Sequence, residues 1–160
     1  MALQSNSRRE LLVGRRTMGD MQRPPDLEPE LVELLIQAAQ AARDNAYAPY
    51  SRYHVGAALV TTDGRIFSGC NVENASFGLS LCAERNAVAA AIAAGERQYT
   101  ALVVVTDSSP PAAPCGACRQ VLVEFGDFHV LLVNAAGDRR TTTVAELQPR
   151  PFRGDALPRP

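Results

Sequence analysis

The fold of this chain is decided by three consecutive runs: YTALVVVT (residues 99–106), PCGACRQVLVEF (residues 114–125) and FHVLLVN (residues 128–134). The first and third runs are apolar on both faces, which is typical of strands buried inside a sheet. The run between them has the length of a short helix, and Gly126 is a natural stop for it. A strand, a helix and a strand in this order predict a right-handed crossover within one sheet.

The sequence on either side continues this alternation of helix and strand. Leu and Ala residues recur every three to four positions over residues 31–46, so a helix is expected there, beginning at Asp26 or Pro29. Asp63-Gly64 predicts a tight turn between two hairpin strands. The other expected elements are strands at 55–62, 65–72 and 140–143 and helices at 82–94 and 144–147. We therefore expect an α/β fold, with a mixed five-stranded sheet and helices on both faces.

The composition is that of a single globular domain. A chain of 160 residues with 46% hydrophobic and 21% charged residues can bury a core without disulfides. We expect a disordered N-terminal extension at 1–25, a folded domain at 26–157 and a C-terminal tail at 158–160. Residues 1–23 carry a net charge of +3 and residues 24–160 a net charge of −4. An acidic body argues against a partner that is a nucleic acid.

The sequence also argues against a membrane partner. Its longest apolar run, residues 87–94, has eight residues, whereas a spanning helix needs about 18. Leu11-Leu12-Val13 is too short for the apolar region of a signal peptide. We therefore expect a cytoplasmic protein.

Three of the four cysteines stand where helices are expected to begin. Cys115 and Cys118 form a Cys-x-x-Cys pair after Pro114, and Cys82 opens the other helix. Both helices follow loops that leave the carboxyl ends of strands, where sheets of this kind bind their ligands. A helix N-terminus favours the thiolate form of cysteine, and three thiolates suit Zn²⁺ with one coordination position open for catalysis.

Glu84 favours this catalytic interpretation over two others. The Cys-x-x-Cys pair could also be a redox pair, or part of a structural zinc site with a fourth ligand from Cys70, His54 or His129. A carboxylate two residues after a ligand, however, can face water at the metal and carry its proton. Cys-x-Glu followed about 30 residues later by Pro-Cys-x-x-Cys is the three-cysteine form of the zinc-deaminase signature.

Three blocks of sequence extend this likeness well beyond the cysteines. They are APYSRYHVGAA (residues 48–58), GCNVENA (69–75) leading into LCAER (81–85), and PCGACRQVL (114–122). With these blocks the chain closely resembles the small, homotetrameric cytidine deaminases of pyrimidine salvage, and the likeness covers Leu31 to about Leu157. The resemblance implies the single-domain fold of that family, one Zn²⁺ per subunit and a homotetramer.

The resemblance also implies the roles of the metal site residues. Cys82, Cys115 and Cys118 are expected to bind zinc, and Glu84 to shuttle protons. Arg85 lies three residues after Cys82 on the same helix, so it can donate hydrogen bonds that offset the charge of the thiolates. The family resemblance supports that role.

Four residues are expected to bind the substrate. The resemblance implies that Asn71 and Glu73 hold the ribose hydroxyls, that the ring of Tyr53 lines the pyrimidine pocket, and that Ala83 contacts the substrate. Asn71 and Glu73 could equally belong to an ordinary polar loop, and Tyr53 to the core or its rim. Tyr53 departs from the family pattern, in which phenylalanine is usual, so its hydroxyl needs a partner or water.

Two aromatic residues resemble positions that contact a neighbouring subunit in this family. Phe77 stands in the loop before Cys82, and Phe152 closes LQPRPF (residues 147–152), where Gln148 replaces a leucine. The alanine-rich helix at 82–94 suggests close packing, either in a subunit interface or in the core.

We therefore expect zinc-dependent hydrolysis of cytidine and 2′-deoxycytidine to uridine and 2′-deoxyuridine with release of ammonia. One alternative is a deaminase of another aminopyrimidine nucleoside such as blasticidin S. The other is a zinc-binding interaction module without catalytic activity.

Overall fold

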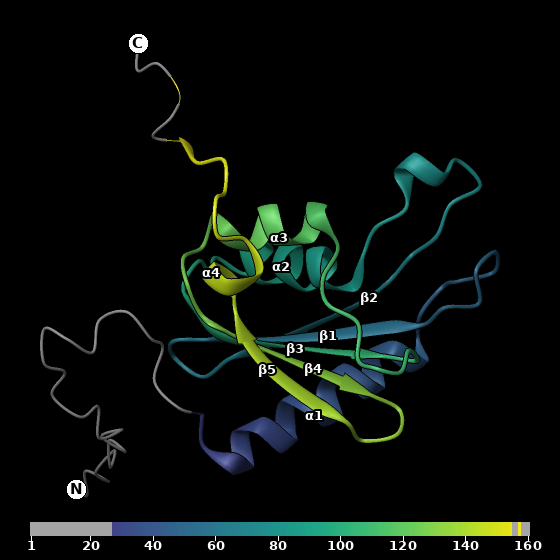
Figure 1. The fold of residues 1–160 in the computed structure, drawn as a ribbon, viewed down its shortest axis with the longest axis horizontal. Helices are drawn as coiled ribbons and strands as arrows, with labels where there is room; N and C mark the ends of the chain where they lie inside the picture. Colours follow the sequence, from purple (N-terminus) through teal and green to yellow (C-terminus); the bar gives the residue numbers. More distant parts are fainter. Residues whose placement is uncertain (1–26, 155–156, 158–160) are drawn as a thin grey trace, which may run out of the picture.

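The structure, a computed structural model, describes residues 27–154 and residue 157 (Figure 1). The predicted disordered extension at 1–25 and the predicted C-terminal tail at 158–160 lie outside these residues. In chain order the elements are α1 (Pro29–Asp44), β1 (Val55–Thr61), β2 (Ile66–Cys70), the 3-10 helix η1 (Phe77–Leu79), α2 (Ala83–Ala93), β3 (Tyr99–Thr106), α3 (Gly116–Val123), β4 (His129–Asn134), β5 (Arg139–Thr143) and α4 (Val144–Leu147). None of the helices in the described part is long and apolar enough to cross a membrane.

The strands form one mixed sheet in the order β2-β1-β3-β4-β5. β3 and β4 pair in parallel, and the other three neighbouring pairs are antiparallel. The parallel pair is connected through α3, as the three runs of the sequence predict. The prediction of an α/β fold with a mixed five-stranded sheet is confirmed.

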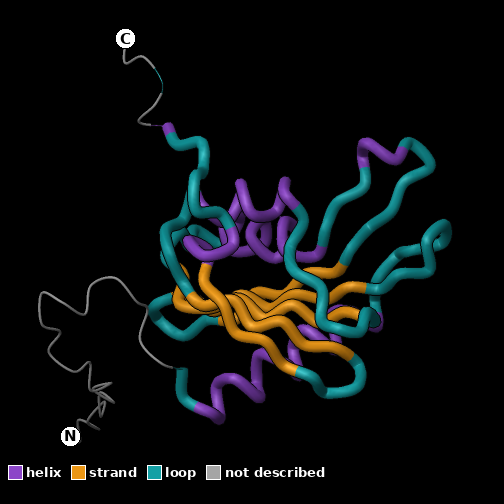
Figure 2. The backbone as a smooth tube through the Cα atoms, in the orientation of Figure 1, coloured by secondary structure: helices purple, strands orange, loops and turns teal. Residues whose placement is uncertain are grey.

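The sheet has an apolar cluster on each face. Side chains of β1 alternate between the two, with Ala57 and Leu59 in the cluster that includes residues of α2 and α3. Ala58 and Val60 belong to the other cluster, which includes residues of α1. Figure 2 shows α1 below the sheet and α2, α3 and α4 above it. Helices on both faces are thus confirmed, and β1 is buried along its whole length.

Two glycines let helices come unusually close to the sheet. A Cβ atom at Gly69 of β2 would lie 2.5 Å from the backbone nitrogen of Ala87 and 2.7 Å from the carbonyl oxygen of Ala83. On the other face, a Cβ atom at Gly56 would lie 1.9 Å from the carbonyl oxygen of Ala39 in α1. The contact at Gly69 therefore fixes the position of the first turns of α2 against β2.

The ends of the elements differ from the predictions by one or two residues. α1 ends at Asp44 rather than near residue 46, and β2 ends at Cys70 rather than at residue 72. Val72 leaves the hairpin because it forms isolated bridges with two other segments. Cys82 and Cys115 are the N-caps of α2 and α3 rather than their first helical residues.

The carboxyl ends of β2, β3 and β4 all lie at one edge of the sheet. β1 is antiparallel to both β2 and β3, so β2 runs in the same direction as β3 and β4. The loops at 71–82 and 107–115 leave this edge and lead into α2 and α3 (Figure 1). This is the place at which the sequence predicts the chemistry.

Candidate active site

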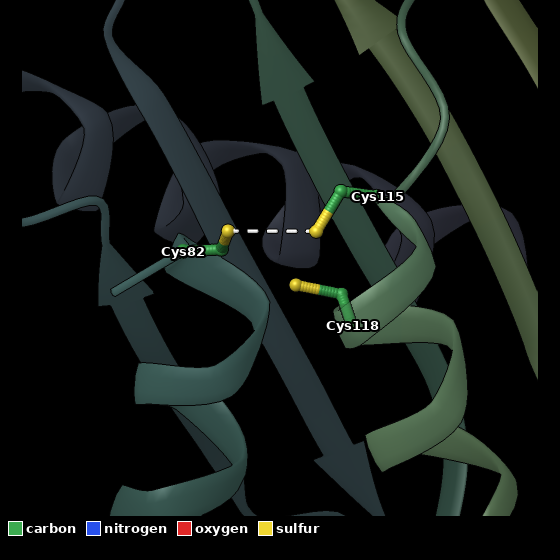
Figure 3. Close-up of side chains that lie close together, drawn as sticks. All are labelled: Cys82, Cys115 and Cys118. Carbon is green, nitrogen blue, oxygen red and sulfur yellow. Dashed lines mark hydrogen bonds between the residues drawn. The ribbon is translucent and has the colours of Figure 1, made fainter. Parts of the chain in front are cut away.

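The loops at this edge bring three thiols together. Cys82 caps α2, Cys115 caps α3, and Cys118 lies in the first turn of α3. Their Sγ atoms all lie within 4.8 Å of one another, and those of Cys82 and Cys115 are 3.7 Å apart. Figure 3 shows the three side chains converging from the two helix ends. The structure thus groups the three residues that the sequence predicts as zinc ligands.

The spacing of the sulfur atoms fits a zinc ion. Tetrahedral coordination with Zn–S bonds of about 2.3 Å places sulfur atoms roughly 3.8 Å apart. The Sγ atoms of Cys82 and Cys115 are already near that distance, and all three cysteines are free thiols. A redox pair, by contrast, has no need of a third thiol at the same point. The structure therefore favours a metal site over the redox alternative.

The group contains three protein ligands. Among residues 27–154, no fourth His, Cys, Asp or Glu ligand atom lies within 4.8 Å of all three sulfur atoms. Cys70, His54 and His129 are therefore not part of the group. Three protein ligands leave one tetrahedral position for water or substrate, which is the arrangement of catalytic rather than structural zinc.

Cys82 and Cys118 have pKa values shifted in opposite directions. Hydrogen bonding from Cys118, and then from Arg85, lowers the pKa of Cys82 to about 5. The hydrogen bond with Cys82 raises the pKa of Cys118. Nη2 of Arg85 lies 3.7 Å from Sγ of Cys82 and donates a hydrogen bond to the carbonyl oxygen of Ser80. Arg85 thus stands beside a thiolate, where a positive charge can offset the charge of the site.

Glu84 is a buried carboxyl group in the same site. It is the second residue of α2, its exposed fraction is 5%, and it lines a cavity together with Cys82 and Cys115. Burial raises the pKa of the Glu84 carboxyl, and the nearby charge of Cys82 raises it further. A carboxyl group with a raised pKa exchanges protons closer to neutral pH, which suits a general acid and base.

The cavity has a volume of about 550 Å³, which is within the usual range of small-molecule sites. It contains every residue that the sequence assigns to substrate binding, together with one of the two expected subunit-contact aromatics. These lining residues are Tyr53, Asn71, Glu73, Phe77 and Ala83.

Backbone groups of the preceding segment hold Asn71 and Glu73 in place. Oδ1 of Asn71 accepts a hydrogen bond from the backbone N–H of Val55, and Nδ2 donates to the carbonyl oxygen of Tyr53. Oε2 of Glu73 accepts from the backbone N–H groups of residues 50 and 51. Hydrogen bonding, first from the side chain of Ser51, lowers the pKa of Glu73, which therefore remains an ionised acceptor. Both side chains are fixed at the cavity wall.

The two expected subunit-contact aromatics are exposed in the single chain. Phe77 is 75% exposed, and its ring meets the ring of Tyr50 edge-on at 5.8 Å between centroids. Phe152 is 61% exposed and does not line the cavity of its own chain. Its carbonyl oxygen accepts a hydrogen bond of 2.7 Å from Nε2 of Gln120 in α3.

Arg119 has a structural role that the sequence did not reveal. In the structure it is half-buried, and its Nε donates to the carbonyl oxygen of Pro114 at 2.7 Å. Its Nη1 donates to the carbonyl oxygen of Leu147. Arg119 therefore ties the residue before Cys115 to α4, a contact between segments that sequence spacing cannot predict.

Comparisons with known proteins agree with this site. The family model for the cytidine and deoxycytidylate deaminase zinc-binding region matches residues 29–134. A cytidine deaminase of Sporosarcina psychrophila is 48% identical over 79% of this chain and 94% of its own length. The crystal structure of a cytidine deaminase from Burkholderia pseudomallei has a TM-score of 0.73 and 55% identity, covering 75% of this chain and 98% of that one. A blasticidin-S deaminase of Bacillus cereus is 29% identical over 62% of this chain and 76% of its own length.

A mixed sheet that presents three thiols and a buried carboxyl group at one edge is the arrangement expected of a metal-dependent hydrolytic enzyme. The matches to the family model and to close relatives identify the family: the chain belongs to the cytidine deaminases. Zinc is the metal of that family, and Cys82, Cys115 and Cys118 form a group positioned to bind it. The family and cofactor expected from the sequence are confirmed.

Cys118→Ala should abolish zinc binding, because two thiolates from separate helices cannot replace the chelating set of three. Metal analysis of the purified protein should show zinc falling from about one ion per chain toward none. Cys70→Ala is the matched control. Cys70 lies outside the group, so this variant should keep its zinc. A full zinc complement in Cys118→Ala would contradict the ligand assignment.

Proposed function

We propose that this enzyme hydrolyses cytidine and 2′-deoxycytidine to uridine and 2′-deoxyuridine, with release of ammonia. The observation that carries the proposal is the buried Glu84 carboxyl group beside three converging thiols, in a cavity large enough for a nucleoside. Relatives named cytidine deaminase, at 48% and 55% identity over most of this chain, support cytidine as a substrate.

Glu84 is the proton carrier of the proposed reaction. Zinc held by the three cysteines would supply a Lewis acid that brings the pKa of water to around 7. The Glu84 carboxylate accepts a proton from the attacking water and delivers it to ring nitrogen N3, while the water oxygen bonds to C4. Glu84 then transfers the second proton of that water to the amino group, which leaves as ammonia when the C4–N bond breaks.

Arg85 and the two helix N-termini are proposed to offset the charge of the site. Three thiolates outweigh the two positive charges of zinc, and an excess of negative charge weakens it as a Lewis acid. The N-terminus of a helix is equivalent to roughly half a positive charge. Arg85 adds a full charge at hydrogen-bonding distance from Cys82.

Four residues of the cavity are proposed to hold the nucleoside. The anchored side chains of Asn71 and Glu73 bind the ribose hydroxyls, and the ring of Tyr53 packs against the pyrimidine. Ala83 is the first residue of α2, so its N–H has no partner within the helix and is available to the substrate.

The alternative substrate blasticidin S is less well supported. The blasticidin-S deaminase relative is 29% identical to this chain, against 48% for the cytidine deaminase of Sporosarcina psychrophila. The pairing of Asn71 with Glu73 in the cavity also favours a ribose. The non-catalytic interaction module is less well supported. Glu84 is a buried carboxyl group beside the three thiols, and a binding module has no use for such a group.

We further propose a cytoplasmic homotetramer that acts in pyrimidine salvage. Large apolar side chains are exposed around the cavity mouth, and alanines are exposed on the outer face of α2, which suits burial against other copies of the chain. Tyr50, Val72, Phe77 and Leu81 are exposed apolar residues that line the cavity, and Ala89, Ala90 and Ala93 are exposed alanines of α2. Phe152 could then reach the cavity of a neighbouring subunit.

Light scattering of the zinc-loaded protein should give four times the 17.2 kDa mass of the chain. The physical reason for association is the exposed apolar surface around Phe77, because its contact with water is unfavourable and burial between subunits removes it. A mass near that of a single chain would reject the tetramer and leave the proposed reaction standing.

Glu84→Gln should retain zinc and lose activity, because glutamine cannot accept and release a proton. We expect kcat for cytidine to fall by about 10²–10⁴-fold, the usual range for removing a general acid and base. Glu124→Gln removes the same charge from an exposed position at the end of α3 and should leave kcat unchanged. Turnover of Glu84→Gln close to that of the parent enzyme would exclude Glu84 from the mechanism.

A further inference from the structure

We propose that the hydroxyl group of Tyr53 is a positioning group for the substrate cavity. Through Ser108 and Thr106, it holds the loop of residues 107–113 in place as one wall of that cavity. The inference rests on the proposed function, and it adds a role for Tyr53 that is separate from the packing of its ring.

Three hydrogen bonds link Tyr53 to this loop. The Tyr53 hydroxyl donates to Oγ of Ser108 at 3.2 Å. Oγ of Ser108 lies 3.0 Å from Oγ1 of Thr106, and this Oγ1 accepts a hydrogen bond of 3.4 Å from the backbone N–H of Ala112. The chain of hydroxyls therefore runs from the segment before β1, across the end of β3, to the far side of the loop.

The linked residues form the cavity wall. Tyr53, Thr106, Ala112 and Ala113 all line the cavity, and Thr106 is nearly fully buried. Ser108 itself does not line the cavity, but its hydroxyl connects two residues that do, Tyr53 and Thr106. A displacement of the loop would change the shape of the space that receives the substrate.

The loop of residues 107–113 is held by side-chain contacts rather than by backbone hydrogen bonds. Among the described residues, no backbone–backbone hydrogen bond outside helices and strands involves residues 107–113. Pro110 and Pro111 have no N–H group to donate. At its start the loop is tied by an ion pair between Arg43 and Asp107. The hydroxyl chain is thus the contact that fixes its middle.

The zinc ligands are held separately from this loop. Arg119 binds the carbonyl oxygen of Pro114, directly before Cys115, and Cys118 is buried within α3. Loss of the Tyr53 hydroxyl should therefore leave the metal site intact and act on the cavity wall. A weaker hold on the substrate, rather than a slower chemical step, is the expected effect.

Tyr53→Phe tests this inference, because phenylalanine keeps the ring and removes the hydroxyl. Amide hydrogen exchange of the segment 107–115 should accelerate about two- to tenfold, the effect expected for loss of one hydrogen bond. KM for cytidine should rise by about the same factor, while kcat stays within about twofold and zinc content is unchanged.

Tyr99→Phe is the matched control. The Tyr99 hydroxyl donates to the carbonyl oxygen of Glu96 at 3.1 Å, near the beginning of β3 and away from the cavity. Loss of this hydroxyl removes a comparable hydrogen bond, yet exchange in 107–115 and KM should match the parent enzyme.

Ser108→Ala gives a second route to the same result. It should reproduce the faster exchange and the higher KM of Tyr53→Phe. Because both residues act through one chain, the double variant should lose no more than either single variant. Additive losses would show that Tyr53 and Ser108 act independently and would overturn the proposed chain.

The two readouts separate this inference from the proposed function. Unchanged exchange in Tyr53→Phe would overturn the hold on the loop. Faster exchange with an unchanged KM would show that the Tyr53–Ser108 hydrogen bond supports the loop without affecting substrate binding, and would overturn the proposed role of the hydroxyl. If the parent enzyme released no ammonia from cytidine, the proposed function would fail, while the exchange comparison would still decide whether Tyr53 holds the loop.

Discussion

The close contact between α2 and β2 at Gly69 is the constraint on which the site depends. Because residue 69 has no Cβ, the backbone of α2 between Ala83 and Ala87 can rest directly on the strand. This contact places the start of α2, and with it Cys82 and Glu84, at the carboxyl edge of the sheet. α3 begins at the same edge, because the crossover from β3 to β4 requires it. Zinc binding thus follows from where two helices begin, rather than from any one loop.

The site concentrates negative charge in a partly buried place, and the fold supplies the opposing charge. Cys82 is stabilised as a thiolate by hydrogen bonds and by the end of α2, while Glu84 is buried so that its pKa rises. The two groups are only two residues apart, yet their environments shift their pKa values in opposite directions. These opposite shifts suit the proposed roles, in which Cys82 is a zinc ligand and Glu84 carries a proton.

The sequence predicted most of what depends on local pattern. The runs at 99–106 and 128–134 are apolar on both faces, so their place inside the sheet was clear. The Cys-x-Glu and Cys-x-x-Cys spacings pointed to the three thiols that the structure groups. Contacts between distant segments were not predictable, because no periodicity encodes them. The partner of the Tyr53 hydroxyl, the anchoring of Asn71 by Val55 and the bond of Arg119 to Leu147 are of this kind. The tetramer and the role of Phe152 stay predictions, since they concern other copies of the chain.

The most direct test of the account is ammonia release by the zinc-loaded protein from cytidine, 2′-deoxycytidine, free cytosine and blasticidin S, each supplied separately. The account predicts rapid release from the two nucleosides and little from cytosine, because cytosine lacks the sugar that Asn71 and Glu73 are proposed to bind. Release from blasticidin S alone would keep the role of Glu84 and overturn the substrate. No release from any of the four compounds, with zinc bound, would contradict the assignment of a deaminase.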